Sequence, residues 1–290
     1  MMKQIAIYIS LLLAIVFCYS CETEIEIDTG EFIPRHVIEG YIENDAYAWV
    51  TITNNVPFFG ELNLDISSAE NAMQLLEDLF VLTATVVVDD GIVFDTLAFM
   101  IDPGIMQQKL IWPPVKYQGS KLMGSVGGKY NLTVTIGENV YTSSTTITKP
   151  LVPDSMWFVQ ENDTTFGMVY ALVTDDASVA NYYQYFVKRL GKDDYFVPGF
   201  LSLWDDSFFN GQQFVVNVYR GSLPSYLRDT TYNDEWRKYM IGDTMQMKSV
   251  SMDRASYEFW QSHAKTNIRG GALGVWCGFG AHYSEPLVCE

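Results

Sequence analysis

The chain has 290 residues, 48% of them hydrophobic, and a formal net charge of −17. This length allows one large domain or two small ones, and the apolar content is ample for a packed core. The negative charge argues against nucleic acid as a partner, because nucleic-acid binding needs a basic surface, and it disfavours electrostatic adsorption to anionic lipid.

Residues 1–20 have the pattern of a lipoprotein signal peptide. Lys3 precedes an uncharged apolar run, residues 5–17, which is too short to span a bilayer stably. Ser20 then provides the small residue that a lipoprotein signal peptidase requires directly before a cysteine, Cys21. We expect cleavage after residue 20 and acylation of Cys21, which would anchor the protein to a membrane. The alternative is an ordinary cleaved signal that leaves Cys21 as a free thiol.

An acidic tether, residues 21–34, follows the signal. Four carboxylates lie within seven residues of it: Glu22, Glu24, Glu26 and Asp28. Such a run is commonly a solvated, flexible segment. Its position directly after the lipidated cysteine also fits an export signal for the outer face of the outer membrane.

Residues 35–150 have the spacing of strands in an immunoglobulin-like β-sandwich. A capping box of Ser67 and Glu70 predicts one short helix, and Asp89-Asp90-Gly91 predicts a hairpin turn. The clearest alternation puts Tyr130, Leu132, Val134 and Ile136 on one face of a strand. The predicted strands cover residues 36–42, 48–53, 84–88, 92–94, 127–136 and 140–147. Pro150 and Pro153 then indicate a linker.

Residues 151–290 are also β-like and predict a second sandwich-like domain with a short helix, so the fold class is all-β. The expected helix covers residues 251–263, with Ser251 or Asp253 near its N-cap. Candidate strands lie at 157–159, 167–173 and 182–188, and a last strand within 270–281 is entered through glycines.

Two cysteines are left once the signal is removed and Cys21 is acylated. An oxidising envelope compartment permits a disulfide between this pair, Cys277 and Cys289. Two separate buried thiols are the alternative, because the sequence gives no Cβ geometry.

Twelve aromatic residues are concentrated between residues 195 and 239. Aromatic side chains anchor interfaces and stack on sugars, but they also fill hydrophobic cores. Trp204 and Trp236 have charged sequence neighbours, so they are our candidates for a ligand or partner face. Packing in the core is the competing interpretation for both.

Several segments, taken in order, resemble the Bacteroidota lipoprotein family called domain of unknown function 4249. They are the acidic run after Cys21, residues 37–42, residues 128–134, residues 141–147 with the prolines that follow, and residues 267–276. The resemblance spans nearly the whole chain. It implies a cell-surface β-protein whose partner is a TonB-dependent outer-membrane transporter, since members of the family tend to be encoded beside such receptors.

The sequence has no recognised catalytic or metal-binding motif. The three histidines lack the spacing of a zinc pair, and there is no nucleophile elbow and no phosphate-binding loop. We therefore expect no enzyme activity, no cofactor and no metal. The expected function is that of an accessory lipoprotein that captures a ligand or stabilises a transporter complex. The alternatives are a structural or adhesion module of the cell surface and a hydrolase acting on a surface polymer.

The anchoring hypothesis predicts that Cys21→Ala releases the protein from membranes or leaves an uncleaved precursor, because position 21 then has no thiol to take the lipid. Labelled palmitate should enter the parent protein and not the variant. Label that still enters the variant would assign the lipid to another residue.

Overall fold

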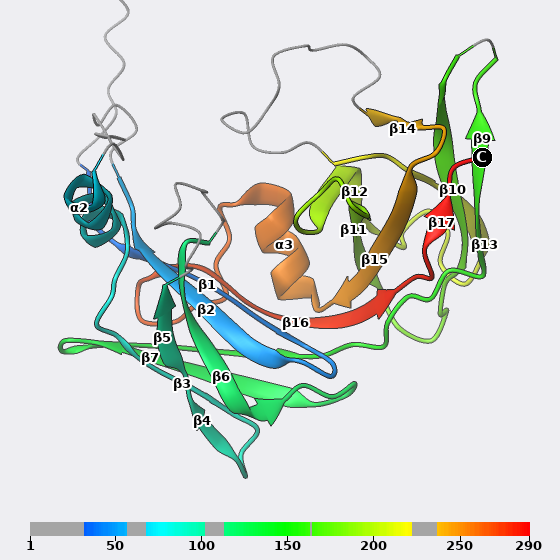
Figure 1. The fold of residues 1–290 in the computed structure, drawn as a ribbon. Helices are drawn as coiled ribbons and strands as arrows, with labels where there is room; N and C mark the ends of the chain where they lie inside the picture. The colour runs from blue at the N-terminus through cyan, green and yellow to red at the C-terminus, as the bar shows by residue number, and fades with distance from the viewer. Residues whose placement is uncertain (1–31, 57–67, 102–112, 163, 222–236) are drawn as a thin grey trace, which may run out of the picture. The chain divides into compact units, whose positions relative to one another are not determined.

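The computed structural model describes residues 32–56, 68–101, 113–162, 164–221 and 237–290. Residues 34–290 form one compact unit, and the described part of it is built almost entirely of β-strands arranged in three sheets (Figure 1). The all-β prediction is therefore confirmed.

The largest sheet joins strands from both halves of the sequence. Its order is β12-β11-β15-β16-β1-β2-β6-β5, and β17 pairs with β15 beyond the main path. The strands are β1 (His36–Glu43), β2 (Tyr47–Asn54), β5 (Ala98–Ile101), β6 (Val115–Met123), β11 (Tyr182–Arg189), β12 (Val197–Asp205), β15 (Thr244–Met252), β16 (Leu273–Tyr283) and β17 (Leu287–Val288).

Two four-stranded sheets face the large sheet across separate hydrophobic clusters, so each half of the chain contributes to a sandwich. The first has the order β4-β3-β7-β8 and contains β3 (Thr85–Asp89), β4 (Phe94–Thr96), β7 (Lys129–Ile136) and β8 (Asn139–Thr146). The second is built around β10 and contains β9 (Ser155–Gln160), β10 (Phe166–Thr174), β13 (Gln213–Val218) and β14 (Tyr239–Met240).

Both predicted helices are present. Helix α2 (Ala69–Leu79) begins after Ser68, whose side chain accepts a hydrogen bond from the Asn71 amide, so the N-cap is one residue later than predicted. Helix α3 (Arg254–Ser262) is capped by Asp253, which accepts from the Ser256 amide. The helix is shorter than predicted because its first expected residues end β15 instead.

Strand β16 connects the two sandwiches. It comes from the end of the chain, yet it pairs in parallel with β1 along seven residues, from Val37 opposite Leu273 to Glu43 opposite Phe279. On its other side it pairs with β15. The long hydrophobic run of β16 fits a strand that is covered on both faces, and its two parts pair with different neighbours, residues 273–279 with β1 and residues 280–283 with β15.

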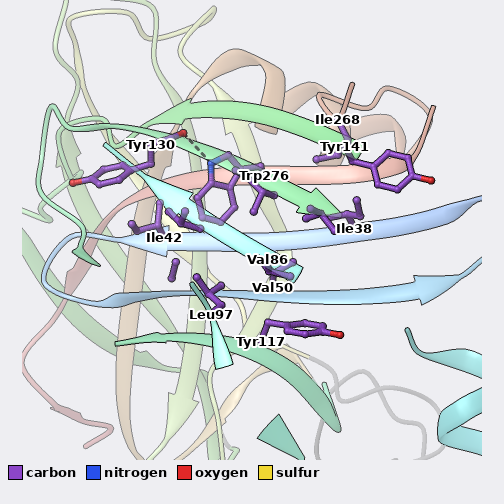
Figure 2. Packing of buried hydrophobic residues seen from close by; sticks show 14 of the residues in the cluster. Ile38, Ile42, Val50, Val86, Leu97, Tyr117, Tyr130, Tyr141, Ile268 and Trp276 are labelled. Atoms are coloured by element: carbon purple, nitrogen blue, oxygen red, sulfur yellow. Dashed lines mark hydrogen bonds between the residues drawn. The ribbon is translucent and has the colours of Figure 1, made fainter. Parts of the chain in front are cut away.

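Among the residues that the structure describes, Trp276 of β16 is the largest fully buried side chain. Figure 2 shows its indole among residues of the first sandwich, including Ile38 and Ile42, with a hydrogen bond of 3.0 Å from its Nε1 to the Tyr130 carbonyl. The Asn267 side chain supports the same residue from outside the sheet. It accepts from the Trp276 amide at 2.9 Å and donates to the Trp276 carbonyl at 2.8 Å, as a neighbouring strand would.

The segment that joins the two halves, residues 147–151, lies against β15 and β16. Ser251 and Ser249 donate from their hydroxyl groups to the carbonyls of Lys149 and Leu151, each at 2.5 Å. A Cβ atom on Gly280 would lie 2.0 Å from the Thr148 carbonyl oxygen, so only glycine permits this close approach.

The expected division into domains 35–150 and 151–290 is therefore crossed by continuous strand pairing. The first sandwich needs β16 to complete its sheet and Trp276 to fill its core. Pro150 and Pro153 lie where the sequence predicted a linker, but the segment beside them is hydrogen-bonded to β15 rather than free.

Replacing Trp276 with alanine is expected to reduce the free energy of unfolding by about 3–5 kcal/mol, the usual cost of truncating a buried aromatic residue. Urea unfolding followed by tryptophan fluorescence and circular dichroism should show one transition in the parent protein and in the variant, because both sandwiches share one sheet. Trp157→Ala, which truncates a half-buried tryptophan on β9, is the matched control and should cost less. Two separate transitions in the parent protein would contradict the shared sheet.

Candidate partner-binding surface

Several predicted site residues lie outside the described part of the chain. They are Cys21, the acidic residues Glu22, Glu24, Glu26 and Asp28, and Trp236. The lipid anchor, the export signal and the position of Trp236 therefore stay predictions.

Trp204 belongs to the packing of the second sandwich, which is the competing interpretation that the sequence left open, and its place at a ligand or partner face stays a prediction. Its half-buried indole packs against the two hydrophobic clusters of that half. The ring centroid lies 6.2 Å from that of Tyr183 and 5.6 Å from that of Tyr185. Of the charged neighbours that suggested exposure, Asp205 is the last residue of β12 and Asp206 is the first residue of the loop that follows.

The cysteine pair is not bridged in the structure. Cys277 and Cys289 are both free and buried, and they lie in different hydrophobic clusters, which separates the two thiols. Burial raises the pKa of Cys277 well above its usual value, and burial together with Asp243 raises the pKa of Cys289 to about 11. Both groups are therefore protonated thiols at neutral pH.

Two loops with buried carboxylates are joined at one end of the second sandwich. We call residues 175–181 and 205–211 the acidic loop pair. Asp175 accepts from the Tyr183 hydroxyl at 2.6 Å and from the Gly211 amide at 2.8 Å. Asp206 accepts from the Asn181 amide at 2.8 Å. These bonds connect the two loops, so the carboxylates have a positioning role.

The acidic loop pair presents apolar side chains to solvent. The side chain of Phe208 is 94% exposed, although Phe209 beside it stacks on Phe214 with centroids 3.7 Å apart. Val179, on the other loop, is 57% exposed. The hydrogen bonds between the two loops fix the backbone from which Phe208 projects, so a contact made by Phe208 would order little additional backbone.

Helix α3 lies beside this loop pair and covers part of one face of the large sheet (Figure 1). The Tyr257 hydroxyl donates to Asp205 at 3.3 Å, and the Tyr257 ring lies 4.9 Å from that of Tyr182. At its start, Asp253 accepts from the Thr145 hydroxyl at 2.6 Å, which fixes the helix to the first sandwich as well.

An aromatic patch continues from α3 across the sheet. We define it as Tyr41, Trp49, Phe186, Trp260 and Phe279. The Tyr41 ring lies centrally, with its centroid 4.6 Å from Trp49, 5.1 Å from Phe279 and 6.1 Å from Trp260. Trp49, Phe186 and Trp260 are half-buried, so the patch is partly open.

An ion pair ends the aromatic patch. Lys248 of β15 pairs with Glu43 of β1, and both side chains are less than a fifth exposed. The Lys248 ammonium also lies 5.4 Å from the Phe186 centroid and 5.8 Å from that of Phe279, within range of cation–π attraction. The Tyr283 hydroxyl donates to Glu43 at 3.0 Å. Each charge thus has a partner inside the fold, and these contacts connect three neighbouring strands, β15, β1 and β16.

Within the described ranges, no group of three or more His, Cys, Asp or Glu side chains is arranged to hold a metal ion. Among the same residues, no helix has the length and apolar character needed to cross a membrane. Phe208 is one of the twelve aromatic residues between residues 195 and 239, but the sequence pattern pointed to Trp204 and Trp236 instead. The signal that could have selected it is the pair of acidic and turn-forming segments that enclose it, Asp205-Asp206 and Asn210-Gly211.

Free-thiol counting tests the cysteine geometry. A chain that begins at Glu22, denatured without reductant, is expected to show two reactive thiols, because Cys277 and Cys289 are both free. In the folded protein both should react slowly at about pH 8, since their raised pKa values leave little thiolate. Cys289→Ser should halve the denatured count. No reactive thiol in the denatured parent chain would mean that the pair is bridged.

Comparison with known families gives one match that covers most of the chain. The model of a family described as "Domain of unknown function (DUF4249)" matches residues 22–273. No curated protein matches the sequence. The matched range runs from the acidic segment through β15 and α3 and ends at the first residue of β16, so it confirms the family that the sequence motifs resemble. The chain belongs to the DUF4249 family.

Proposed function

We propose that this protein is a non-catalytic lipoprotein of the outer membrane that acts as an accessory partner of a TonB-dependent transporter. It would be anchored through Cys21 and face the cell exterior. Its contribution would be to capture a ligand for the transporter or to stabilise the transporter complex.

The observation that carries this proposal is the exposed Phe208 on the acidic loop pair, next to α3. A side chain that is 94% exposed contributes nothing to the packing of its own chain. It is nevertheless held on a loop fixed by Asp175 and Asp206. A rigid aromatic residue that projects into solvent is a typical energetic centre of a protein interface.

Anchoring makes even a weak contact sufficient. Two proteins attached to one membrane have a high effective concentration for each other, so the affinity needed for a lasting complex is modest. The acidic surface of the chain would add selectivity for a partner with basic loops, because electrostatic complementarity affects partner choice and association rate more than final affinity.

The proposal predicts that Phe208→Ala weakens co-purification with the transporter about tenfold, the loss expected when an interface anchor is truncated. The measurement is a pull-down of the tagged, lipidated protein from mild-detergent membranes after cross-linking in whole cells, with the transporter quantified by mass spectrometry. The thermal stability of the protein should not change, because the Phe208 ring is exposed.

Tyr47→Ala is the matched control, since it also removes an exposed aromatic ring, one that is 40% exposed on β2. It should leave the yield of transporter unchanged. Failure to capture any transporter with the parent protein would refute the proposed partner. Equal yields from the parent protein and Phe208→Ala would refute the assignment of the surface.

A further inference from the structure

A second exposed apolar element lies on the first sandwich, in the hairpin between β3 and β4. Ile92 is 85% exposed, Phe94 is 63% exposed and Val93 is 39% exposed, so three consecutive apolar residues lie at the surface. Figure 1 shows the tip of this hairpin projecting beyond the neighbouring end of β6. Single exposed apolar residues are ordinary, but a contiguous run at a projecting tip needs an explanation.

The turn is held in one conformation by its own carboxylates. Asp90 accepts from the amides of Ile92 and Val93 at 2.9 and 2.7 Å. Asp89 accepts from the Gly91 amide at 3.0 Å and from the Asn131 side chain of the adjacent strand at 2.9 Å. The exposed side chains are therefore presented from a fixed backbone.

The base of the hairpin is fixed to the large sheet. Asp95, on β4, accepts from the amides of Ser120, Lys121 and Leu122 at 2.8, 2.8 and 3.1 Å. Burial raises the pKa of this carboxyl, but these backbone donors outweigh that effect and the pKa lies below its ordinary value. The hairpin is thus fixed to the sandwich at its base, and this attachment holds the tip in a defined position.

We propose that the β3–β4 tip is a protein-docking element that inserts Ile92 and Phe94 into an apolar pocket with a basic rim on another protein. This contact is separate from the one proposed at Phe208. It uses a different sandwich and different residues, so each can fail without the other.

Charge determines the kind of occupant. Hydrogen bonds from the Val93 and Ile92 amides lower the pKa of the exposed Asp90 carboxyl, which therefore stays ionised at neutral pH. An ionised carboxylate within the tip opposes insertion into a bilayer, and a net charge of −17 opposes approach to anionic lipid. A second copy of the chain would bring the same negative charge. A pocket that is apolar inside and basic at its rim would bury the apolar side chains of the tip and place positive charge beside its carboxylates.

The test places a photo-crosslinking amino acid at position 93 of the full-length, lipidated chain in whole cells. The expected product is an adduct with a different protein, mapped by mass spectrometry to an apolar segment flanked by Lys or Arg. The control position is 140, because Val140 is a 53% exposed valine on β8. It should not give this adduct.

Two variants separate the apolar and electrostatic contributions. Ile92→Ser combined with Phe94→Ser should lower the adduct yield about tenfold or more, because the two anchors are lost. Asp90→Asn keeps an oxygen that can accept from the turn amides but removes the charge, so it should lower the yield and weaken its dependence on salt. Each variant is checked for an unchanged thermal midpoint.

Several outcomes would overturn the inference. These are an adduct with lipid, an adduct with a second copy of this chain, no adduct at position 93, or an undiminished yield from the double serine variant. Flotation of a purified chain that begins at Glu22, and so carries no acyl anchor, with phosphatidylcholine and phosphatidylglycerol vesicles adds an independent check, and binding to either would favour a membrane contact. If this adduct is absent while Phe208 still supports capture of the transporter, the docking element is refuted and the proposed function is not.

Discussion

The parallel pairing of β1 with β16 is the interaction on which the rest of this structure depends. It joins residues at opposite ends of the described chain along seven positions and brings Trp276 into the core of the first sandwich. Non-local pairing of this kind is entropically costly until the whole sheet forms, so it ties the stability of the two sandwiches together. The close approach of Gly274 to Ile38, where a Cβ atom would lie 2.0 Å from the carbonyl oxygen, is one local requirement of that pairing.

Polar side chains complete the junction between the sandwiches. Thr145 accepts from the Gly278 amide at 2.8 Å and donates to Asp253, so one hydroxyl group links β8, β16 and the cap of α3. The serines of β15 bind the connecting segment in the same manner. Buried hydroxyl groups that are fully hydrogen-bonded specify a unique arrangement, whereas an unpaired one would be costly. The junction therefore has little freedom to open as a hinge.

The acidic residues of this protein have at least two structural uses. Some, such as Asp175 and Asp95, are buried and accept several hydrogen bonds from backbone or side-chain donors, and the buried Asp206 accepts one from the Asn181 amide. Others, such as Asp90, hold tight turns at the surface while staying charged. In the acidic loop pair and in the β3–β4 hairpin, carboxylates fix a loop that presents apolar side chains. Such pre-organisation lowers the entropic cost of binding.

The sequence by itself determined the features that depend on local pattern. These include the signal pattern before Cys21, the all-β class, the β7–β8 hairpin with its alternating face and the turn at Asp89-Asp90-Gly91, because periodicity and turn chemistry act over a few residues. Only the tertiary structure decided how the strands are ordered. It placed β16 beside β1, left Cys277 and Cys289 apart, buried part of Trp204 and exposed Phe208. Parallel pairing across more than two hundred residues has no local signature, and neighbouring charges do not reveal whether an aromatic side chain points into the core or into solvent.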